Sequence, residues 1–282
     1  MKVGVIGTGN MGTILIEALV EADALHPSDL TITNRTLPKA LALKDKYPEI
    51  SVVDSGEKVA KESEAIFVCV KPLDFHKIIM DIEPYTNISK CVISITSPIS
   101  VRQLESMLAC SCARLIPSIT NRALAGVSLL TFGERCSPEW VSILTNLAAQ
   151  ISIPVKVEND ITRVASDIVS CGPAFFSYLA RVFIEGACKT TNIEEQTAIL
   201  LTEKMLIGLG ELLKKEVYTL PTLQEKVCVK GGITGEGIKV LEAEVRDMFE
   251  KLFLATHGKF HHELEKIEEQ YGTPYYYSPS SR

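Results

Sequence analysis

The stretch that decides the fold lies at the start of the chain, where residues 2–22 read KVGVIGTGNMGTILIEALVEA. Lys2–Ile6 is predicted to be a strand, and Met11–Ala22 has the apolar spacing of a helix. Between them, Gly7-Thr8-Gly9-Asn10-Met11-Gly12 fits the pattern G-x-G-x-x-G. In this position the pattern indicates a dinucleotide-binding turn, with a tight bend at Gly7, close approach of a pyrophosphate at Gly9 and helix packing at Gly12. We therefore predict cofactor contacts at Gly7, Thr8, Gly9, Asn10 and Met11; a tight turn without ligand is the alternative.

The end of the second predicted strand, Leu30–Thr33, bears on which dinucleotide is bound. Proteins that bind NAD usually place an acidic residue there to hold the ribose 2′-hydroxyl. Here the residues are Thr33-Asn34-Arg35-Thr36, with no carboxylate. Arg35 can pair with a 2′-phosphate, and Asn34 and Thr36 can donate hydrogen bonds to it. We predict a preference for NADP(H), with NAD as the alternative if Arg35 stacks on adenine or lies in solvent.

A third predicted contact follows the apolar run Ala65–Val70, which is typical of a strand covered on both faces. Val70-Lys71-Pro72 leaves the carboxyl end of this strand, where ligands bind in doubly wound sheets. We therefore add Val70, Lys71 and Pro72 to the predicted cofactor site. A surface lysine with no ligand is the alternative for Lys71.

The first half of the chain alternates predicted strands and helices, which indicates a parallel sheet covered by helices. Further strands are expected at 91–95, 113–116, 127–132 and 151–157, and helices at 73–79, 101–108 and 138–149. Beyond Glu158 the pattern becomes helical, at 161–169, 174–189, 193–215 and 238–253. The predicted fold class is α/β, with an N-terminal Rossmann-type doubly wound sheet followed by an all-α domain. The expected division is 1–158 for NADP binding, 159–270 for the helical domain and 271–282 for a flexible tail.

The predicted helix Ala174–Lys189 is apolar on nearly every side. Such a helix should be buried, and a domain of about 110 residues offers too little interior to bury it fully. The sequence thus predicts a homodimer, or an oligomer built from dimers.

A second glycine-rich segment, Lys230-Gly231-Gly232-Ile233-Thr234-Gly235-Glu236-Gly237, has four glycines in residues 231–237. It is expected to link two helices, either as a flexible hinge or as a nest of backbone N–H groups that suits a carboxylate. Gly172-Pro173 also opens a predicted helix. Together these features favour a small anionic substrate.

Composition limits the other classes of function. The 282 residues carry a net charge of −6, so we expect no nucleic-acid partner. The longest uncharged run, Trp140–Val155, is interrupted by polar residues, and Val3–Ile6 is too short for a signal peptide, so we expect a cytoplasmic protein without a membrane span. The eight cysteines form no CxxC pair, so we expect reduced thiols and no metal site.

Seven segments of the chain form an ordered set: VGVIGTGNMG at 3–12, TNRT at 33–36, VKP at 70–72, SIT at 94–96, GPAF at 172–175, LQEKV at 223–227 and GGITGEG at 231–237. They occur in the order found in pyrroline-5-carboxylate reductases, and the chain resembles that family from residue 1 to about 268. The details are most similar to the ComER-like branch, which takes its name from a competence operon. The resemblance implies a helical dimerisation domain and NAD(P)H-dependent reduction of a cyclic imine to proline.

The resemblance also implies the substrate site, where this chain departs from the family pattern. Cys171 stands where the family commonly has the second serine of Ser-Gly-Ser-Gly-Pro, and Lys230 and Ile233 replace the proline and first threonine of Ser-Pro-Gly-Gly-Thr-Thr. Thr234 retains the threonine that usually contacts substrate. Predicted substrate contacts are Cys171, Lys230, Gly231, Gly232, Ile233 and Thr234, with Thr234 as the catalytic residue.

The predicted reaction is NADPH-dependent reduction of pyrroline-5-carboxylate, a small anionic imine, to proline. The nicotinamide supplies the hydride, and the protein supplies orientation and electrostatics, which fits a chain without a paired-carboxylate or His–Asp pattern. Two alternatives stay open: a non-catalytic or regulatory NADP-binding paralogue, and a reductase of a different imine or of a β-hydroxy acid. The β-hydroxy-acid chemistry usually needs a helix-borne lysine, for which Lys189 and Lys204 are available without an accompanying motif.

Overall fold

The structure is a computed structural model that describes residues 1–275. It divides into two compact units, which are described separately. One unit is Met1–Gly172 together with the chain from Thr256 onward, and the other is Pro173–Ala255. The predicted boundary near residue 158 differs from this division and stays a prediction.

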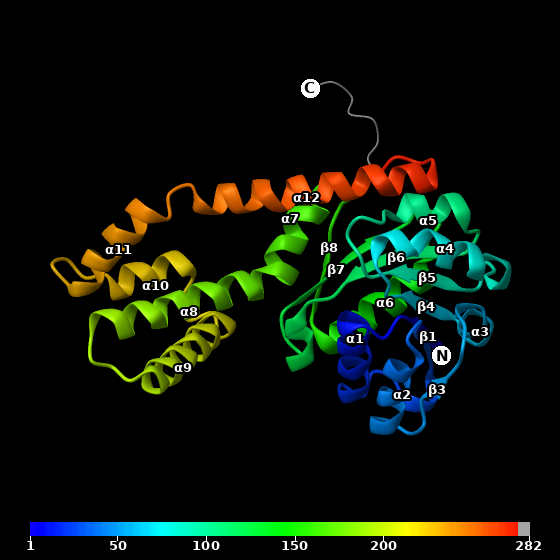
Figure 1. The fold of residues 1–282 in the computed structure, drawn as a ribbon, viewed down its shortest axis with the longest axis horizontal. Coiled ribbons are helices and arrows are strands. Elements are labelled where there is room, and N and C mark those ends of the chain that lie inside the picture. Colours follow the sequence, from blue (N-terminus) through cyan, green and yellow to red (C-terminus); the bar gives the residue numbers. More distant parts are fainter. Residues whose placement is uncertain (276–282) are drawn as a thin grey trace. The chain divides into compact units, whose positions relative to one another are not determined.

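The first unit is built on an eight-stranded sheet with the order β3-β2-β1-β4-β5-β6-β7-β8 (Figure 1). All neighbouring strands pair in parallel except β6 and β7, which are antiparallel. The predicted doubly wound sheet is thus confirmed. The strands are β1 (Val3–Ile6), β2 (Leu30–Thr33), β3 (Ser51–Val52), β4 (Ala65–Val68), β5 (Cys91–Ser94), β6 (Ser111–Ile116), β7 (Val127–Phe132) and β8 (Ile153–Lys156).

Two apolar cores cover the two faces of this sheet, which explains why its central strands read as continuous apolar runs. In β4, Ala65 and Phe67 belong to one core, and Ile66 and Val68 belong to the other. The first core includes side chains from α1 (Asn10–Glu21), α2 (Leu37–Lys46) and α6 (Pro138–Ile151). The second includes side chains from α3 (Gly56–Glu62), α4 (Pro72–Ile82), α5 (Val101–Met107) and the last turns of α12 (Met248–Tyr271). The result is a three-layer arrangement.

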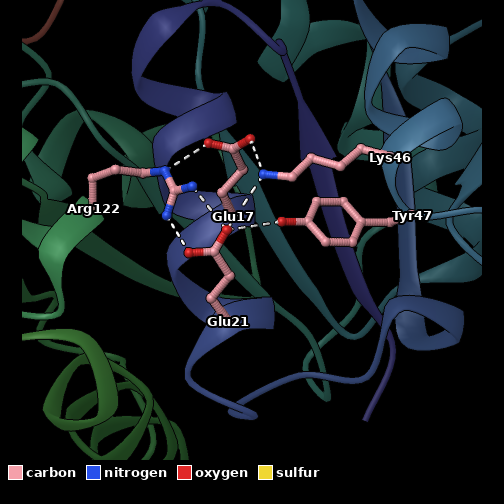
Figure 2. Close-up of polar contacts among 5 residues, drawn as sticks. All are labelled: Glu17, Glu21, Lys46, Tyr47 and Arg122. Atoms are coloured by element: carbon pink, nitrogen blue, oxygen red, sulfur yellow. Dashed lines mark hydrogen bonds and ion pairs between the residues drawn. The ribbon is translucent and has the colours of Figure 1, made fainter.

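Shorter helical turns complete the unit. They are the 3-10 turns η1 (Pro27–Asp29), η2 (Glu83–Tyr85) and η3 (Ile119–Ala123), the helix α7 (Thr162–Ser166) and the π-helical turn η4 (Asp167–Cys171). The turn η3 follows β6 and is tied to α1 by a network of charged side chains. In it, Arg122 pairs with Glu17 and Glu21, and Lys46 and Tyr47 complete the contacts (Figure 2).

The second unit is entirely helical. It contains most of α8 (Gly172–Thr190), α9 (Glu195–Lys214), α10 (Leu220–Val227), α11 (Ile233–Glu244) and the first residues of α12. Apolar side chains remain exposed along α8 in this single chain; Phe183, for example, is 65% exposed. The helices also line an apolar cavity of about 1240 Å³, to which Phe176, Leu206 and Phe249 contribute.

The structure corrects the predicted elements near residues 231–253. A single helix was expected at 238–253 after a glycine-rich linker. Instead, α11 already begins at Ile233 and ends at Glu244, and a separate helix, α12, begins at Met248. Thr234, Gly235 and Gly237 are therefore helical, and only Gly231 and Gly232 remain in the turn. Glycine inside a helix costs about 1 kcal/mol relative to alanine, a modest cost for a helix that turns Ile238 and Leu241 toward the apolar cavity.

The predicted flexible tail is also wrong in its first residues. Tyr275 is 2% exposed and packs edge-on against Phe260 at 5.6 Å. Its hydroxyl donates to the carbonyl oxygen of Ser97 at 2.9 Å, and the carbonyl of Thr273 accepts a hydrogen bond from Gln103. The rest of the predicted tail, residues 276–282, lies outside the described residues.

One helical stretch is more apolar than the sequence analysis allowed. Among the described residues, the helical stretch Thr162–Thr190 is long and apolar enough, by length and composition alone, to cross a membrane. Only 11% of its most apolar 18-residue segment is buried. The expectation that no segment could qualify was wrong because it required a run without charges. A helix that pairs with another subunit passes the same test, so this feature is weak evidence for a membrane.

Candidate dinucleotide site

The turn between β1 and α1 has a backbone that only glycine fits at two positions. Gly7 has φ +104°, and a Cβ there would collide with the carbonyl oxygen of Cys69. A Cβ at Gly12 would collide with the carbonyl oxygen of Gly7. The turn is therefore held against the end of β4, where the N–H of Cys69 donates to the carbonyl of Ile6 at 2.7 Å.

The N-terminus of α1 has the features of an anion site. Gly9 is its N-cap, no side chain caps it, and its first turn carries no acidic residue. A Cβ at Gly9 would meet nothing within 4 Å, so the space beside this residue is open. The hydroxyl oxygen of Thr8 is buried without a hydrogen-bond partner in the structure. Free N–H groups and the positive end of the helix dipole suit a pyrophosphate, so the residues present fit a dinucleotide.

Asn34 joins this turn to the loop after β2. The backbone N–H of Thr8 donates to Asn34 Oδ1 at 3.0 Å, and Asn34 Nδ2 donates to the carbonyl of Thr36 at 2.9 Å. Both polar atoms of the Asn34 amide are thus engaged with the protein. The Nδ2 group carries a second N–H, so the predicted donation from Asn34 to a phosphate stays a prediction.

Arg35 extends from the same loop and is an accessible cation of the site. Its side chain is 85% exposed, and Nη1 lies 3.5 Å from Asp74 Oδ2 on α4. Thr36 is the N-cap of α2, and its hydroxyl makes no capping hydrogen bond. Both side chains are therefore available to a ligand at the adenosine end.

The loop after β4 forms the other side of the turn. Lys71 is exposed as the N-cap of α4, Pro72 is the first residue of that helix, and Val70 is half-buried. Burial raises the pKa of the neighbouring Cys69 thiol, which keeps it neutral. The structure thus brings together, at the carboxyl ends of β1, β2 and β4, all the residues predicted to bind the cofactor.

Two buried or half-buried arginines, Arg114 and Arg163, bind the loop after β5 and were not predicted from the sequence. Arg114 is buried and donates to the carbonyls of Ser97 and Ile99 at 3.1 and 3.3 Å, and to the Tyr275 hydroxyl. Arg163 Nη1 donates to Ser97 Oγ at 3.0 Å. The i, i+4 spacing of Arg163 and Asp167 was the only sequence signal for this cluster.

Cys171 lies at the end of this cluster, in η4. Arg163 Nη2 pairs with Asp167 Oδ1 at 2.6 Å and lies 3.6 Å from Cys171 Sγ. Asp167 Oδ2 also accepts a hydrogen bond from Thr256 at 2.8 Å and lies 3.6 Å from His257 Nε2. Burial raises the pKa of the Cys171 thiol, so at neutral pH it is a weak, uncharged donor.

The other predicted substrate residues lie in the helical unit, at the start of α11. Gly231 has φ +77°, Gly232 is the N-cap without a side-chain cap, and Thr234 is exposed in the first turn. Ile233 is 93% exposed, and Lys230 is exposed in the turn before the helix. The structure therefore gathers Lys230–Thr234 at one uncapped helix N-terminus and leaves Cys171 in the other unit.

No group of three or more histidine, cysteine or acidic side chains suited to a metal ion occurs within residues 1–275. The donors of the candidate site are backbone N–H groups, hydroxyls and cations. These groups suit an anionic dinucleotide.

Comparisons with known proteins assign the class. Residues 159–262 match the family described as pyrroline-5-carboxylate reductase dimerisation, and residues 2–98 match NADP oxidoreductase, coenzyme F420-dependent. The chain belongs to the pyrroline-5-carboxylate reductase family, as its sequence motifs predict. It thus combines an NADP-oxidoreductase-type domain with a helical dimerisation domain.

Among individual relatives, ComE operon protein 4 of Bacillus subtilis (strain 168) is 54% identical over 96% of this chain and 99% of its own length. Pyrroline-5-carboxylate reductase 3 of the same organism is 29% identical over 95% of this chain and 99% of its own length. The solved pyrroline carboxylate reductase of Plasmodium falciparum with NADP bound has a TM-score of 0.79 at 20% identity, covering 96% of this chain and 98% of its own. At that identity the likeness shows the fold alone.

Proposed function

We propose that this protein is an NADPH-dependent reductase that converts the cyclic imine pyrroline-5-carboxylate to proline. The observation that carries the proposal is the open N-terminus of α1, with the uncapped Gly9 and the buried, unpartnered Thr8 hydroxyl. These features suit the pyrophosphate of a dinucleotide and thereby support the proposal. Membership of the pyrroline-5-carboxylate reductase family supplies the proposed reaction.

NADPH is the proposed cofactor because the loop after β2 offers Arg35 in place of a carboxylate. The relative from Plasmodium falciparum was solved with NADP bound, which supports the same choice. The alternative is NADH, with Arg35 stacked on the adenine ring. The nicotinamide would supply a hydride to the carbon of the imine, and the imine nitrogen takes up a proton.

The substrate contacts are proposed at the start of α11. An uncapped helix N-terminus with Gly231 and Gly232 presents backbone N–H groups that suit the substrate carboxylate. Lys230 adds a positive charge, Ile233 contributes apolar surface, and the Thr234 hydroxyl donates to the substrate or its imine nitrogen. Cys171 lies in the sheet unit, and its proposed contact with the substrate, as an uncharged thiol, rests on the family resemblance alone.

A second copy of the chain is the proposed partner, as a homodimer or an oligomer of dimers. The match to a dimerisation family spans residues 159–262, which include the exposed apolar residues of α8. Burying Phe176 and Phe183 against another copy would remove an apolar patch too large for a soluble monomer. The same pairing would account for the apolar stretch Thr162–Thr190, so we propose a cytoplasmic location with no membrane or nucleic-acid partner.

A non-catalytic or regulatory NADP-binding role is the second candidate. It is favoured by Cys171 and Ile233, which replace family residues in the substrate half, and by a 54% identical relative whose name states no reaction. Reduction of a different imine or of a β-hydroxy acid is a further alternative. The helix-borne lysines that the β-hydroxy-acid reaction would use, Lys189 and Lys204, lie on α8 and α9 in the helical unit.

One assay separates these candidates. NADPH oxidation is followed at saturating pyrroline-5-carboxylate, with a cyclic imine that lacks the carboxylate and a β-hydroxy acid plus NADP as comparison substrates. Turnover only with pyrroline-5-carboxylate supports the proposal. NADPH binding without turnover of any substrate would refute the reductase and leave the regulatory role.

A further inference from the structure

We propose that Asp74 is a specificity-determining residue that opposes the 2′-phosphate of NADP(H) and thereby limits discrimination against NAD(H). The inference rests on the proposed function, because it assumes that a dinucleotide binds at the β1–α1 turn. Asp74 lies in α4 and belongs neither to the glycine turn nor to the loop after β2, from which the cofactor contacts were predicted.

The sheet order places Arg35 and Asp74 on the two sides of the glycine turn. In that order β1 lies between β2 and β4, and Ile6 pairs in register with both Thr33 and Val68. Arg35 leaves β2 two residues after Thr33, and Asp74 lies in the first turn of α4, which follows β4. Arg35 Nη1 and Asp74 Oδ2 lie 3.5 Å apart, so the two side chains meet at this end of the candidate site.

Through this contact, the Asp74 carboxylate competes with a bound 2′-phosphate for the Arg35 guanidinium. Arg35 is the cation that replaces the acidic residue of NAD-binding proteins, and a 2′-phosphate must either displace Asp74 from it or share it. An exposed ion pair is weak, so displacement is feasible. The carboxylate would nevertheless remain near a group with a charge of about −1.5 to −2, and like charges repel.

Two other roles for Asp74 predict different outcomes. If Asp74 oriented Arg35 toward the phosphate, its loss would weaken NADPH binding. The single 3.5 Å contact and the 85% exposure of Arg35 argue against such orientation. If Asp74 accepted a hydrogen bond from the ribose 2′-hydroxyl of NADH, its loss would weaken NADH binding and leave NADPH binding unchanged.

The test is the variant Asp74→Asn, which keeps the shape of the side chain and removes its charge. Dissociation constants for NADPH and NADH are measured by titration of the full-length protein, for the wild type and for Asp74→Asn. The expected result is NADPH binding about threefold to tenfold tighter, because the Coulomb repulsion between the phosphate and the carboxylate is removed. NADH binding should change by less than about twofold, because its 2′-hydroxyl carries no charge to be repelled.

Asp81→Asn is the matched control, since Asp81 lies in the last turn of the same helix and its loss changes the net charge equally. Unchanged or weaker NADPH binding in Asp74→Asn would overturn the proposal, as would the same gain in Asp81→Asn or an equal gain for NADH. The wild-type titration tests the proposed function separately. If neither dinucleotide binds the wild type, that function fails; if NADPH binds and Asp74→Asn changes nothing, only the role of Asp74 fails.

Discussion

Arg35 is the residue on which the cofactor preference depends in the proposed function. Replacement by alanine should weaken NADPH binding about tenfold to a hundredfold, because a charge-assisted hydrogen bond is worth roughly 1.5–3 kcal/mol. NADH binding should change little. Titration of both cofactors measures the effect, with Lys44→Ala, an exposed cation of α2, as the control for net charge. Equal affinities of the wild type for both cofactors would contradict the prediction.

In the proposed function, Thr234 contributes to turnover and not to cofactor binding. Its hydroxyl is exposed in the first turn of α11. We expect Thr234→Ala to lower kcat about tenfold or more, the loss of a hydrogen bond of 1.5 kcal/mol in the transition state. The NADPH dissociation constant should stay unchanged, and Thr234→Ser should restore turnover. A variant with full activity would remove Thr234 from the proposed site.

The glycine and loop residues of the cofactor site were predictable because their pattern is local. Gly7 and Gly12 are fixed by contacts within a few residues of β1 and β4, and the structure brings all the predicted cofactor residues together. Asp74 was not predictable, because it is 39 residues from Arg35 and only the sheet order brings them close. The hydrogen bond from Thr8 to Asn34 was not predicted either, because the two residues are 26 apart in the sequence.

At the scale of elements, ion pairs between α1 and Arg122 stabilise the packing of η3 against α1. Arg122 donates to Glu21 Oε1 at 2.8 Å, and its Nε lies 2.8 Å from Glu17 Oε2 (Figure 2). Lys46 Nζ donates to Glu17 Oε1 at 2.8 Å, and Tyr47 donates to Glu21 Oε1 at 3.2 Å. The hydrogen bonds from Arg122, with those from Lys46 and Tyr47, lower the pKa of Glu21 to about 2, although partial burial opposes the shift.

This network predicts a stability difference that depends on pH. Because the folded pKa of Glu21 is depressed, its contribution is complete above the unfolded value near 4.5 and is lost as pH falls toward 2. Arg122→Ala should lower the thermal midpoint at pH 7 by roughly 2–4 °C. The difference from wild type should shrink between pH 4.5 and 2. Differential scanning fluorimetry measures it, and Lys58→Ala, which breaks an isolated surface pair with Asp54, should show a smaller effect.

Element boundaries were predicted well where the apolar pattern is bounded by turn residues and poorly where it is not. The strands at 30–33 and 127–132 match the prediction to the residue. The break between α11 and α12 was missed, because Leu241, Val245, Met248 and Leu252 of the sequence continue the helical spacing across it. The glycines at 235 and 237 argued for a loop, but both residues lie within α11, whose Ile238 and Leu241 line the cavity.

For the whole molecule, the sequence predicted a sheet domain followed by a helical domain, and this architecture is confirmed. It did not predict that the chain returns to the sheet unit from Thr256 onward. The return depends on contacts between distant residues, such as Ile267 in the core with α3 and α4, and Tyr275 with Arg114. Periodicity along α12 shows an apolar face but does not identify the surface that covers it.

The last prediction concerns assembly. The helical unit leaves Phe176 and Phe183 more than half exposed beside a cavity of about 1240 Å³, and a dimerisation family matches this region. We expect light scattering at micromolar concentration to give at least twice the 31.0 kDa of one chain. Phe183→Glu should shift the protein toward monomer, because a charge buried in an apolar interface costs several kcal/mol. Ile88→Glu, at an exposed apolar residue of the sheet unit, should leave the mass unchanged. A wild-type particle of 31.0 kDa would contradict the prediction, and so would equal masses for the wild type and Phe183→Glu with both folded by circular dichroism.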